Sequence, residues 1–394
     1  MKPSTSRRDF LQAGLALPVA GLTAHARVGK AGGESAPSVA STSSLESSQQ
    51  LSYRILGKTG LKVTSVGFGC MITSDASVIE RGADIGITYF DTARGYQHGN
   101  NERMVGAALR RKRKDLVLSS KSDGHDKNSL LSDLDTSLRE LGTDYLDIWF
   151  LHERDRISDV SDEMFETQQL ARQQGKIRFT GVSTHRAKDL IPFLVKRNAV
   201  DVVLTTYNFT MDKGMTDVLG QASDAGMGVV AMKVMAGGFR PGNPRRAFYP
   251  QLAKNGALLA ALKWVLKNPK VNTTIPSMTD MDQLEENLKA MAGLFTEVDE
   301  KLLAQQLERI APLYCRMCGK CDGACSQGLP VADLLRYVTY AEGYGQFSLG
   351  REHFLALPDA ITAVRCRDCA NCTVSCPYGV QVANRVARAQ ELFA

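Results

Sequence analysis

The chain has 394 residues, of which 43% are hydrophobic and 23% charged, as in ordinary soluble globular proteins. No stretch offers the roughly 20 consecutive apolar residues that a membrane-spanning helix needs, so we expect no membrane span. Eight of the nine cysteines fall between Cys315 and Cys376, and this clustering excludes a disulfide framework for the whole chain.

The first 26 residues have the features of an export signal. The pair Arg7-Arg8 stands before a mildly apolar run that ends in a small-x-small cleavage site, Ala24-His25-Ala26. This order predicts a twin-arginine signal peptide, recognition by the Tat export machinery and a periplasmic protein; the alternative is a disordered tail with a chance arginine pair. Residues 27–51 are rich in Ser, Ala and Gly and predict a flexible linker.

From residue 52 onward, short β-rich runs alternate with helical stretches. Most of these runs have consecutive apolar or β-branched residues, which is typical of strands buried on both faces. Eight such units favour an α/β fold, a (β/α)8 TIM barrel over residues 52–296, rather than an open doubly wound sheet. The predicted strands are Val66–Gly69, Tyr89–Thr92, Leu116–Lys121, Leu146–His152, Arg178–Ser183, Val202–Tyr207, Val229–Met232 and Thr273–Ile275.

Four polar residues stand at or just after the ends of three of these strands. Asp91, Lys121 and His152 end the second, third and fourth, and Tyr96 follows the second. The carboxyl ends of barrel strands converge on one face, so the four side chains can meet. A tyrosine, with a pKa of ~10, needs a nearby cation to act as an acid–base group at neutral pH. Lys121 can supply that cation, Asp91 can orient it and His152 can bind a carbonyl oxygen, although each residue alone fits an ordinary ion pair or a capped strand end.

Four segments around these positions resemble the aldo-keto reductases. They are Tyr53–Val63, similar to the N-terminal hairpin of that family, Gly86–Tyr96, Leu138–His152 and Gly175–Ser183. The resemblance extends over residues 52–295 and implies a (β/α)8 barrel whose catalytic tetrad is Asp91, Tyr96, Lys121 and His152. It also implies a small carbonyl or alcohol substrate, with Tyr96 as the proton donor when nicotinamide hydride reaches the carbonyl carbon.

The positions that correspond to the family's nicotinamide site are altered. Where the family has Ser, Asn and Gln to hold the carboxamide, this chain has Ser183, Thr184 and Leu204. The aromatic residue that stacks on the nicotinamide is replaced by Met232, a soft side chain that can still pack against a flat ring. The resemblance implies NAD(P)H as a cofactor, held differently from the family pattern.

Two further segments correspond to the rest of the dinucleotide site. Backbone amides of the loop at Gly237-Gly238 can wrap a pyrophosphate, with an ordinary surface loop as the alternative. The segment from Ser277 to the pair Glu286-Asn287 resembles the family's adenine-binding segment. Ser277 stands where the family has a basic residue for the 2′-phosphate, and Asp280 is nearby, which argues against an NADP preference and favours NAD.

The last eighty residues carry two copies of one cysteine spacing, C-x2-C-x2-C-x3-C. This spacing is typical of proteins with two [4Fe–4S] clusters, in which three thiolates of a run bind one cluster and the fourth binds the other. The rule pairs Cys376 with the first three cysteines and Cys325 with the next three; zinc and disulfides are the alternatives. The eight predicted metal ligands are Cys315, Cys318, Cys321, Cys325, Cys366, Cys369, Cys372 and Cys376.

The sequence around the cysteines predicts helices. Val298–Ile310 is expected to form a linker helix, and the stretch from Val331 to about Leu357 also has a helical pattern. Residues 297–394 therefore resemble a linker helix followed by a mainly α-helical dicluster ferredoxin-type domain.

The net charge of +6 gives no evidence of nucleic-acid binding. The predicted signal peptide carries part of it, and two clusters with their thiolates, about −2 each, would offset the remainder. Together the segments predict an exported oxidoreductase that couples a hydride site to two [4Fe–4S] clusters and to a redox electron-transfer partner. The alternatives are an electron-transfer protein whose barrel no longer uses NAD(P)H and a non-catalytic binding protein.

Overall fold

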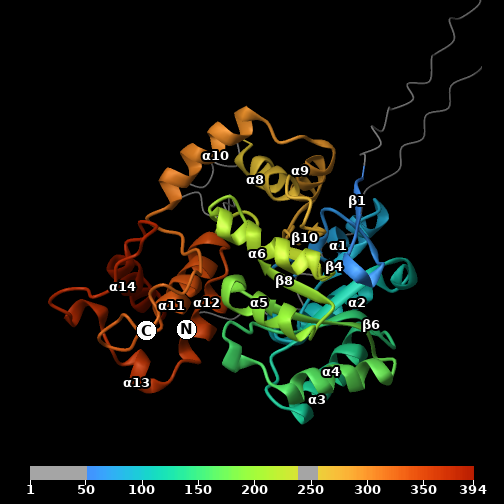
Figure 1. Ribbon diagram of the computed structural model, residues 1–394, viewed down its shortest axis with the longest axis horizontal. Helices are drawn as coiled ribbons and strands as arrows, with labels where there is room; N and C mark the ends of the chain where they lie inside the picture. The colour runs from blue at the N-terminus through green and yellow to red at the C-terminus, as the bar shows by residue number, and fades with distance from the viewer. Residues whose placement is uncertain (1–50, 238–255) are drawn as a thin grey trace, which may run out of the picture. The chain divides into compact units, whose positions relative to one another are not determined.

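The structure is a computed structural model that describes residues 51–237 and 256–394 (Figure 1). The predicted signal peptide, residues 27–50 of the predicted linker and Gly238 lie outside the described residues. Residues 48–394 form one compact unit.

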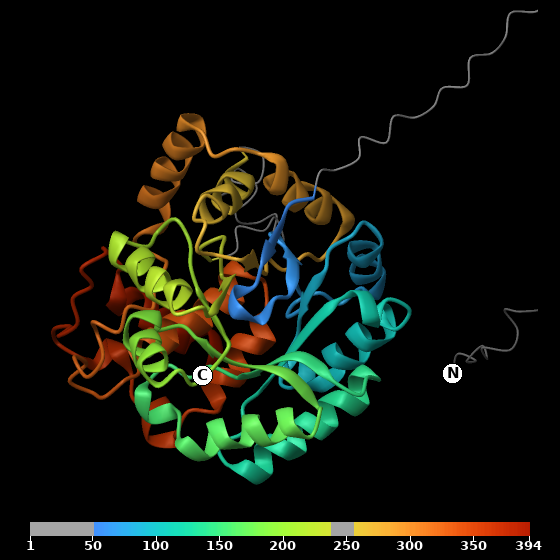
Figure 2. The same cartoon turned by 45° about the vertical axis from the view of Figure 1, so that its right-hand side comes forward.

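Eight parallel strands run in sequence order from β3 to β10, and each pairs with the next. Parallel bridges from Val66 to Thr274 and from Gly69 to Ser277 join the two ends of the sheet. The predicted (β/α)8 barrel is thus confirmed, and Figure 2 shows helices around the outside of the strands. The strands are β3 Phe68–Gly69, β4 Tyr89–Asp91, β5 Val117–Ser122, β6 Leu146–Leu151, β7 Ile177–Thr184, β8 Val202–Thr206, β9 Gly228–Met232 and β10 Thr273–Thr274.

The barrel elements form where the sequence pattern predicts them. Every residue of β5, β6 and β8 is buried, which explains why their sequences are runs of apolar and small residues rather than alternating patterns. The helix α3 buries Leu130, Leu134 and Leu141 on one face. The barrel helices are α1 Ala76–Asp84, α2 Asn100–Leu109, α3 Lys127–Leu141, α4 Asp162–Gln173, α5 Ala187–Arg197, α6 Lys213–Asp224, α8 Ala257–Leu266 and α9 Met281–Ala292.

A β-hairpin closes the amino-terminal end of the barrel. Strands β1 (Tyr53–Ile55) and β2 (Lys62–Thr64) pair antiparallel, and Leu56 and Leu61 are buried in a cluster with Phe150 inside the barrel. The backbone N–H of Lys58 donates to the carbonyl of Gly226, just before β9, at 2.7 Å. Access to the barrel interior therefore remains at the carboxyl ends of the strands.

The C-terminal region is mainly helical, as predicted, and has its own core. The helix α10 (Glu297–Ile310) leads to the cysteine-containing segment, drawn in orange to red in Figure 1. The predicted stretch from Val331 to Leu357 is helical but interrupted after residue 343. Its elements and those that follow are α11 Val331–Val338, the π-helical turn η5 Thr339–Gly343, α12 Phe347–Leu355, α13 Asp359–Thr362 and α14 Val382–Phe393.

The core of this region unites its helices. Leu334 and Val338 of α11 are buried against Phe354 of α12 and Phe393 of α14. Burial of four large apolar side chains gives this helical region a core separate from that of the barrel. Among the described residues, no helix has the length and apolar character required to cross a membrane.

Candidate active site and cluster-binding region

The four residues of the predicted tetrad come together at the carboxyl ends of β4, β5 and β6. Lys121 Nζ donates to Asp91 Oδ2 at 2.6 Å and lies 3.2 Å from Tyr96 Oη. It also donates to the carbonyl of Thr92 at 2.6 Å. Asp91 receives a second hydrogen bond from Ser119 Oγ at 2.7 Å, so its carboxylate is held by two residues of β5.

The rings of Tyr96 and His152 complete this group. Their centroids are 5.7 Å apart with an interplanar angle of 76°, an edge-to-face arrangement. Nδ1 of His152 lies 2.8 Å from Asp123 Oδ1. The loop that carries Tyr96 is fixed by Gln97, whose side-chain amide donates to the carbonyls of Met71 and Thr73. A substrate oxygen placed between the tyrosine hydroxyl and the imidazole would face two polar groups.

The pKa of Tyr96 corrects one part of the prediction. Burial raises the pKa of Tyr96 well above its ordinary value, and the charges of Asp91 and Glu153 raise it further. The prediction considered only the cation of Lys121 and did not include burial, which is the largest cause of the shift. In this arrangement Tyr96 carries its proton at neutral pH, which is the state of a proton donor.

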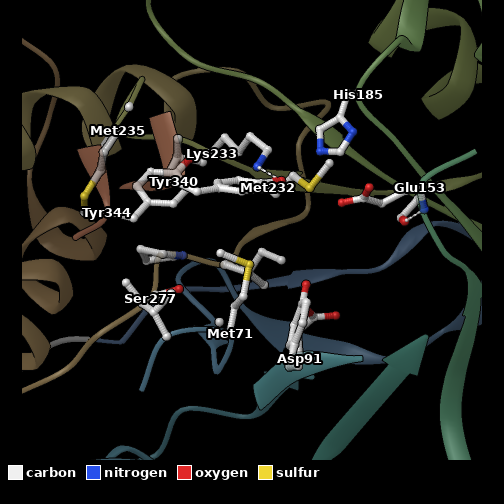
Figure 3. Close-up of a pocket in the computed structure, with 18 of the residues that line it drawn as sticks. Met71, Asp91, Glu153, His185, Met232, Lys233, Met235, Ser277, Tyr340 and Tyr344 are labelled. Atoms are coloured by element: carbon white, nitrogen blue, oxygen red, sulfur yellow. Dashed lines mark hydrogen bonds between the residues drawn. The ribbon is translucent and has the colours of Figure 1, made fainter. Parts of the chain in front are cut away.

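Above the tetrad lies a pocket that encloses roughly 800 Å³ of space open to solvent. Barrel residues and residues of the helical region line it together (Figure 3). Tyr340 of η5 and Tyr344 come from the helical region, whereas Asp91, Tyr96 and His152 come from the barrel. In Figure 3, Lys233 and Tyr340 lie on the side opposite Asp91. The other lining residues are Gly69, Met71, Ile72, Glu153, Ser183, His185, Met232, Val234, Met235, Gly237, Ile275, Pro276 and Ser277.

A buried network of charges joins the pocket wall to the helical region. Arg336 of α11 donates to Glu153 Oε2 at 2.9 Å, and its Nη1 lies 3.0 Å from His185 Nδ1. The same ring nitrogen, His185 Nδ1, also lies 3.1 Å from Asp155 Oδ2. Burial alone would raise the pKa of Glu153, but Arg336 and the neighbouring histidines hold it well below its ordinary value. Glu153 is therefore a carboxylate with its charge already compensated.

The predicted nicotinamide-site residues divide into two groups. Ser183, Met232, Gly237 and Ser277 line the pocket. Thr184 does not, because its hydroxyl donates to Asp155 at 3.3 Å. The structure thus brings part of the predicted set to the tetrad.

The remaining positions lie elsewhere. Leu204 is completely buried inside the barrel with Phe150. Glu286 and Asn287 are on α9, outside the lining of the pocket, and Asn287 is buried. Ser277 also has an interaction of its own within the chain. The adenine-binding role of Glu286 and Asn287 stays a prediction.

The cysteines form two sets that cross the sequence order. Cys315, Cys318, Cys321 and Cys376 line one cavity. Burial raises the pKa of Cys315 to about 12, and the other three thiols of this set add to the shift. The pKa of Cys366 is raised by burial and by the nearness of Cys372, Cys369 and Cys325. Both sets match the crosswise assignment, and all nine cysteines of the chain are free of disulfides.

The four-thiol sets fit [4Fe–4S] clusters by their donor chemistry. Each has three cysteines from one x2-x2 loop and a fourth from the other run, as in two-cluster ferredoxins. Within residues 51–237 and 256–394, no three Cys, His, Asp or Glu side chains are gathered closely enough to hold a single metal ion. In a [4Fe–4S] cluster, by contrast, each thiolate binds a different iron atom, so the four cysteines need not converge on one point.

Direct contacts fasten the first cysteine loop to the barrel. Both guanidinium nitrogens of Arg186, which follows β7, donate to the carboxylate of Asp322, one of them at 2.8 Å. Tyr378, two residues after Cys376, donates to Asp212 at 3.1 Å. The first cysteine set therefore lies beside the barrel.

Sequence analysis missed the residues that the helical region contributes to the pocket. Arg336, Tyr340 and Tyr344 appear in the sequence only as residues of the helical stretch from Val331 to about Leu357. A signal was available for Glu153, because it directly follows the predicted strand end at His152, where barrel active sites are built.

Comparisons with known proteins identify both parts of the chain. Residues 73–258 match the Aldo/keto reductase family, and residues 314–387 match a 4Fe-4S dicluster domain. The uncharacterized oxidoreductase YqkF of Bacillus subtilis is 28% identical over 292 residues, covering 64% of this chain and 94% of that protein. The L-galactose dehydrogenase of Arabidopsis thaliana is 27% identical over 286 residues, covering 62% of this chain and 89% of that enzyme.

A solved structure supports the same conclusion for the barrel. The holo form of the aldo-keto reductase AKR11C1 from Bacillus halodurans has a TM-score of 0.56 and 27% identity, over 65% of this chain and 96% of that one. The barrel fold agrees with these matches. Residues 73–258 therefore belong to an aldo/keto reductase domain, a 4Fe-4S dicluster domain follows it, and the chain is an oxidoreductase.

Proposed function

We propose that this oxidoreductase interconverts a small carbonyl compound and the corresponding alcohol in the pocket, with Tyr96 exchanging a proton with the substrate oxygen. The observation that carries the proposal is the contact of 3.2 Å between Lys121 Nζ and Tyr96 Oη, in a group that faces the pocket with His152. Two relatives whose names state an activity, an L-galactose dehydrogenase and an L-glyceraldehyde 3-phosphate reductase, act on such groups.

The roles of the residues follow from their protonation states. Tyr96 is protonated and donates to the developing alkoxide, and His152 holds the same oxygen. As the proton leaves Tyr96, the ammonium of Lys121 is placed to stabilise the phenolate, while the carboxylate of Asp91 holds that ammonium in position. Reduced nicotinamide, when bound, supplies the hydride, and Ser183, Met232 and Ser277 are the pocket residues that would hold it.

We also propose that the pocket exchanges electrons with the cysteine-bound clusters. Tyr314, next to Cys315, accepts a hydrogen bond from Asn208 Nδ2 at 3.1 Å, and the same amide donates to the carbonyl of Lys233 at 3.0 Å. This chain of contacts joins a predicted cluster ligand to the pocket wall. When bound, two [4Fe–4S] clusters exchange one electron each, which together equals the two electrons of carbonyl–alcohol interconversion.

A second candidate is an electron-transfer protein whose barrel does not use NAD(P)H. It is favoured by Thr184, whose hydroxyl donates to Asp155 instead of lining the pocket, and by Leu204, which has no polar group for a carboxamide. Fluorescence titration of the purified holoprotein with NADH and NADPH separates the candidates. Tight binding of either nucleotide counts against the second candidate.

The test of the catalytic proposal is the change Tyr96→Phe. The anaerobically purified protein is assayed with a panel of aldehydes, ketones and sugars, with NADH, NADPH or reduced methyl viologen as donor. Turnover by the wild type should fall by at least about a hundredfold in Tyr96→Phe. Tyr145→Phe, which alters a partly buried tyrosine outside the pocket, is the control and should keep full activity. Retained turnover in Tyr96→Phe would contradict the assignment.

We further propose that the protein is exported by the twin-arginine route, so that its clusters are loaded before transport. The support is the Arg7-Arg8 pair followed by an apolar run and a cleavage site. Replacing both arginines by lysine should leave the precursor in the cytoplasm, as judged by cell fractionation and by the size of the protein. Unchanged periplasmic accumulation would contradict export by this route.

A further inference from the structure

Lys233 occupies a fixed position in the wall of the pocket, immediately after β9. Its backbone has φ +53°, a left-handed conformation that is costly for a residue with a side chain and persists only where the surroundings impose it. Here the carbonyl of Lys233 receives hydrogen bonds from Asn208 Nδ2 at 3.0 Å and from the backbone N–H of Ala236 at 3.1 Å. These contacts determine where the side chain begins.

The ammonium group of Lys233 is held by aromatic side chains. Its Nζ lies 3.3 Å from Tyr340 Oη, 4.7 Å from the centre of that ring and 5.5 Å from the centre of the Tyr344 ring. Figure 3 shows the lysine beside Tyr340 at the pocket wall. Two tyrosine rings can orient an ammonium, but they do not cancel its charge.

No carboxylate within the described part of the chain forms an ion pair with Lys233. Glu153 also lines the pocket, but its carboxylate is bound by Arg336 at 2.9 Å. Burial lowers the pKa of Lys233 to about 8, and the charge of Arg336 contributes. A partly buried ammonium without a paired carboxylate is unfavourable, and an anion that enters the pocket removes this cost.

We propose that Lys233 is an anion-binding residue, whose ammonium holds a carboxylate or phosphate oxygen of the ligand that occupies the pocket. The inference rests on the proposed function in one respect: the ligand that binds this pocket is taken to react at Tyr96. The anionic group belongs either to the carbonyl substrate or to the pyrophosphate of a dinucleotide. Both bind Lys233 by the same charge-assisted hydrogen bond.

The remaining lining strengthens such a contact. Met71, Met232, Met235 and Ile275 are apolar residues that line the same pocket. Because they displace water, the attraction between the ammonium and an anion is stronger here than on an exposed surface. The pocket thus combines an apolar lining with a hydroxyl group at Tyr96 and a cation at Lys233.

The experiment compares a matched pair of ligands, phenylglyoxylate and its methyl ester, in calorimetric titrations of the holoprotein. NADH is titrated separately. If the anion belongs to the substrate, the wild type binds phenylglyoxylate at least about tenfold more tightly than the ester, and Lys233→Met abolishes this preference. If the anion is the pyrophosphate, Lys233→Met weakens NADH binding at least about tenfold instead. The proposal is overturned if Lys233→Met changes neither the preference for phenylglyoxylate over its ester nor the affinity for NADH. It is also overturned if the wild type neither prefers phenylglyoxylate nor binds NADH.

Two controls keep the result interpretable. Lys233→Arg retains the charge and should keep most of the preference, whereas Lys188→Met removes an exposed lysine, paired with Asp212, that does not line the pocket. Iron content and circular dichroism verify that each variant is folded. Because binding is measured without turnover, Tyr96→Phe should retain the anion preference even if it loses activity. Failure of the catalytic proposal would therefore be distinguished from failure of this one.

Discussion

Arg336 Nη1 lies 2.9 Å from Glu153 Oε2. This ion pair connects α11 of the helical region to the segment that follows β6, where Glu153 comes directly after His152. Both charges are largely removed from water, and His185 shares the same guanidinium nitrogen at 3.0 Å. The pocket wall and the cysteine-containing region are therefore parts of one packed structure, in which the cluster-bearing region shapes the site of the barrel.

The ion pair should be important for stability. Arg336→Met leaves Glu153 buried without its partner, and we expect a loss of about 3 kcal/mol in the free energy of unfolding. Chemical denaturation of the holoprotein measures this change. Arg103→Met, which removes an exposed arginine paired with Glu140 at 2.9 Å, is the matched control and should cost less than about 1 kcal/mol. Equal effects of the two changes would show that the buried pair has no special role.

Anion binding at Lys233 should depend on pH. With a pKa of about 8, the ammonium is protonated at pH 7, so affinity for phenylglyoxylate should fall as pH rises through 8. The ionisable groups around it are Tyr340, Tyr344, Arg336, Glu153, Asp155 and His185. The pKa values of Tyr340 and Arg336 are raised well above their ordinary values, and those of Glu153, Asp155 and His185 are lowered. Calorimetry between pH 6 and 9.5 measures the change. Affinity that is constant over this range in the wild type would contradict the role of Lys233.

The crosswise cysteine sets predict the outcome of double changes. Cys376→Ser combined with Cys318→Ser alters one set and should leave about four of about eight irons per chain. Cys376→Ser combined with Cys369→Ser alters both sets and should remove nearly all of the iron. Iron and acid-labile sulfide analysis after anaerobic purification measures both. The opposite result for the two pairs would indicate that each cluster is held by one cysteine run.

Close backbone contact at Gly343 should be needed to seat η5 on the barrel. A Cβ at this position would overlap the carbonyl oxygen of Gly237, so Gly343→Ala must displace the turn that carries Tyr340. We expect a loss of about 1–3 kcal/mol in stability and weaker ligand binding. Gly220→Ala is the control, since it is on helix α6 with open space around it and should be neutral or slightly stabilising. Unchanged ligand affinity in Gly343→Ala would contradict this role.

The barrel and the tetrad could be predicted because their signals are local. Buried strands appear as apolar runs, and parallel strands bring Asp91, Lys121 and His152 to one face by topology alone. The crosswise cysteine sets followed from spacing for a similar reason. The direction of the pKa shift of Tyr96 could not be predicted, because it depends on burial and on the nearby charges of Asp91 and Glu153.

The second half of the pocket had no local signal. Arg336 and Glu153 are 183 positions apart in the chain, and no pattern in either segment indicates that they meet. The same holds for Lys233 and Tyr340, which are 107 positions apart in the chain. Thr184 directly follows the predicted strand Arg178–Ser183, yet its hydroxyl donates to Asp155, a partner that only the three-dimensional structure shows.

The central claim, that the pocket of Tyr96 and the two clusters work as one oxidoreductase, can be tested by electron paramagnetic resonance. The clusters of the anaerobic protein are reduced, excess reductant is removed, and a panel of carbonyl compounds is added together with a catalytic amount of NAD+, because the proposed function assigns the hydride to nicotinamide. The account predicts that a substrate carbonyl consumes two electrons and two protons, becomes an alcohol, and removes the reduced-cluster signal in the wild type but not in Tyr96→Phe. A signal that persists in the wild type with every carbonyl, or that disappears equally in both proteins, would contradict the account.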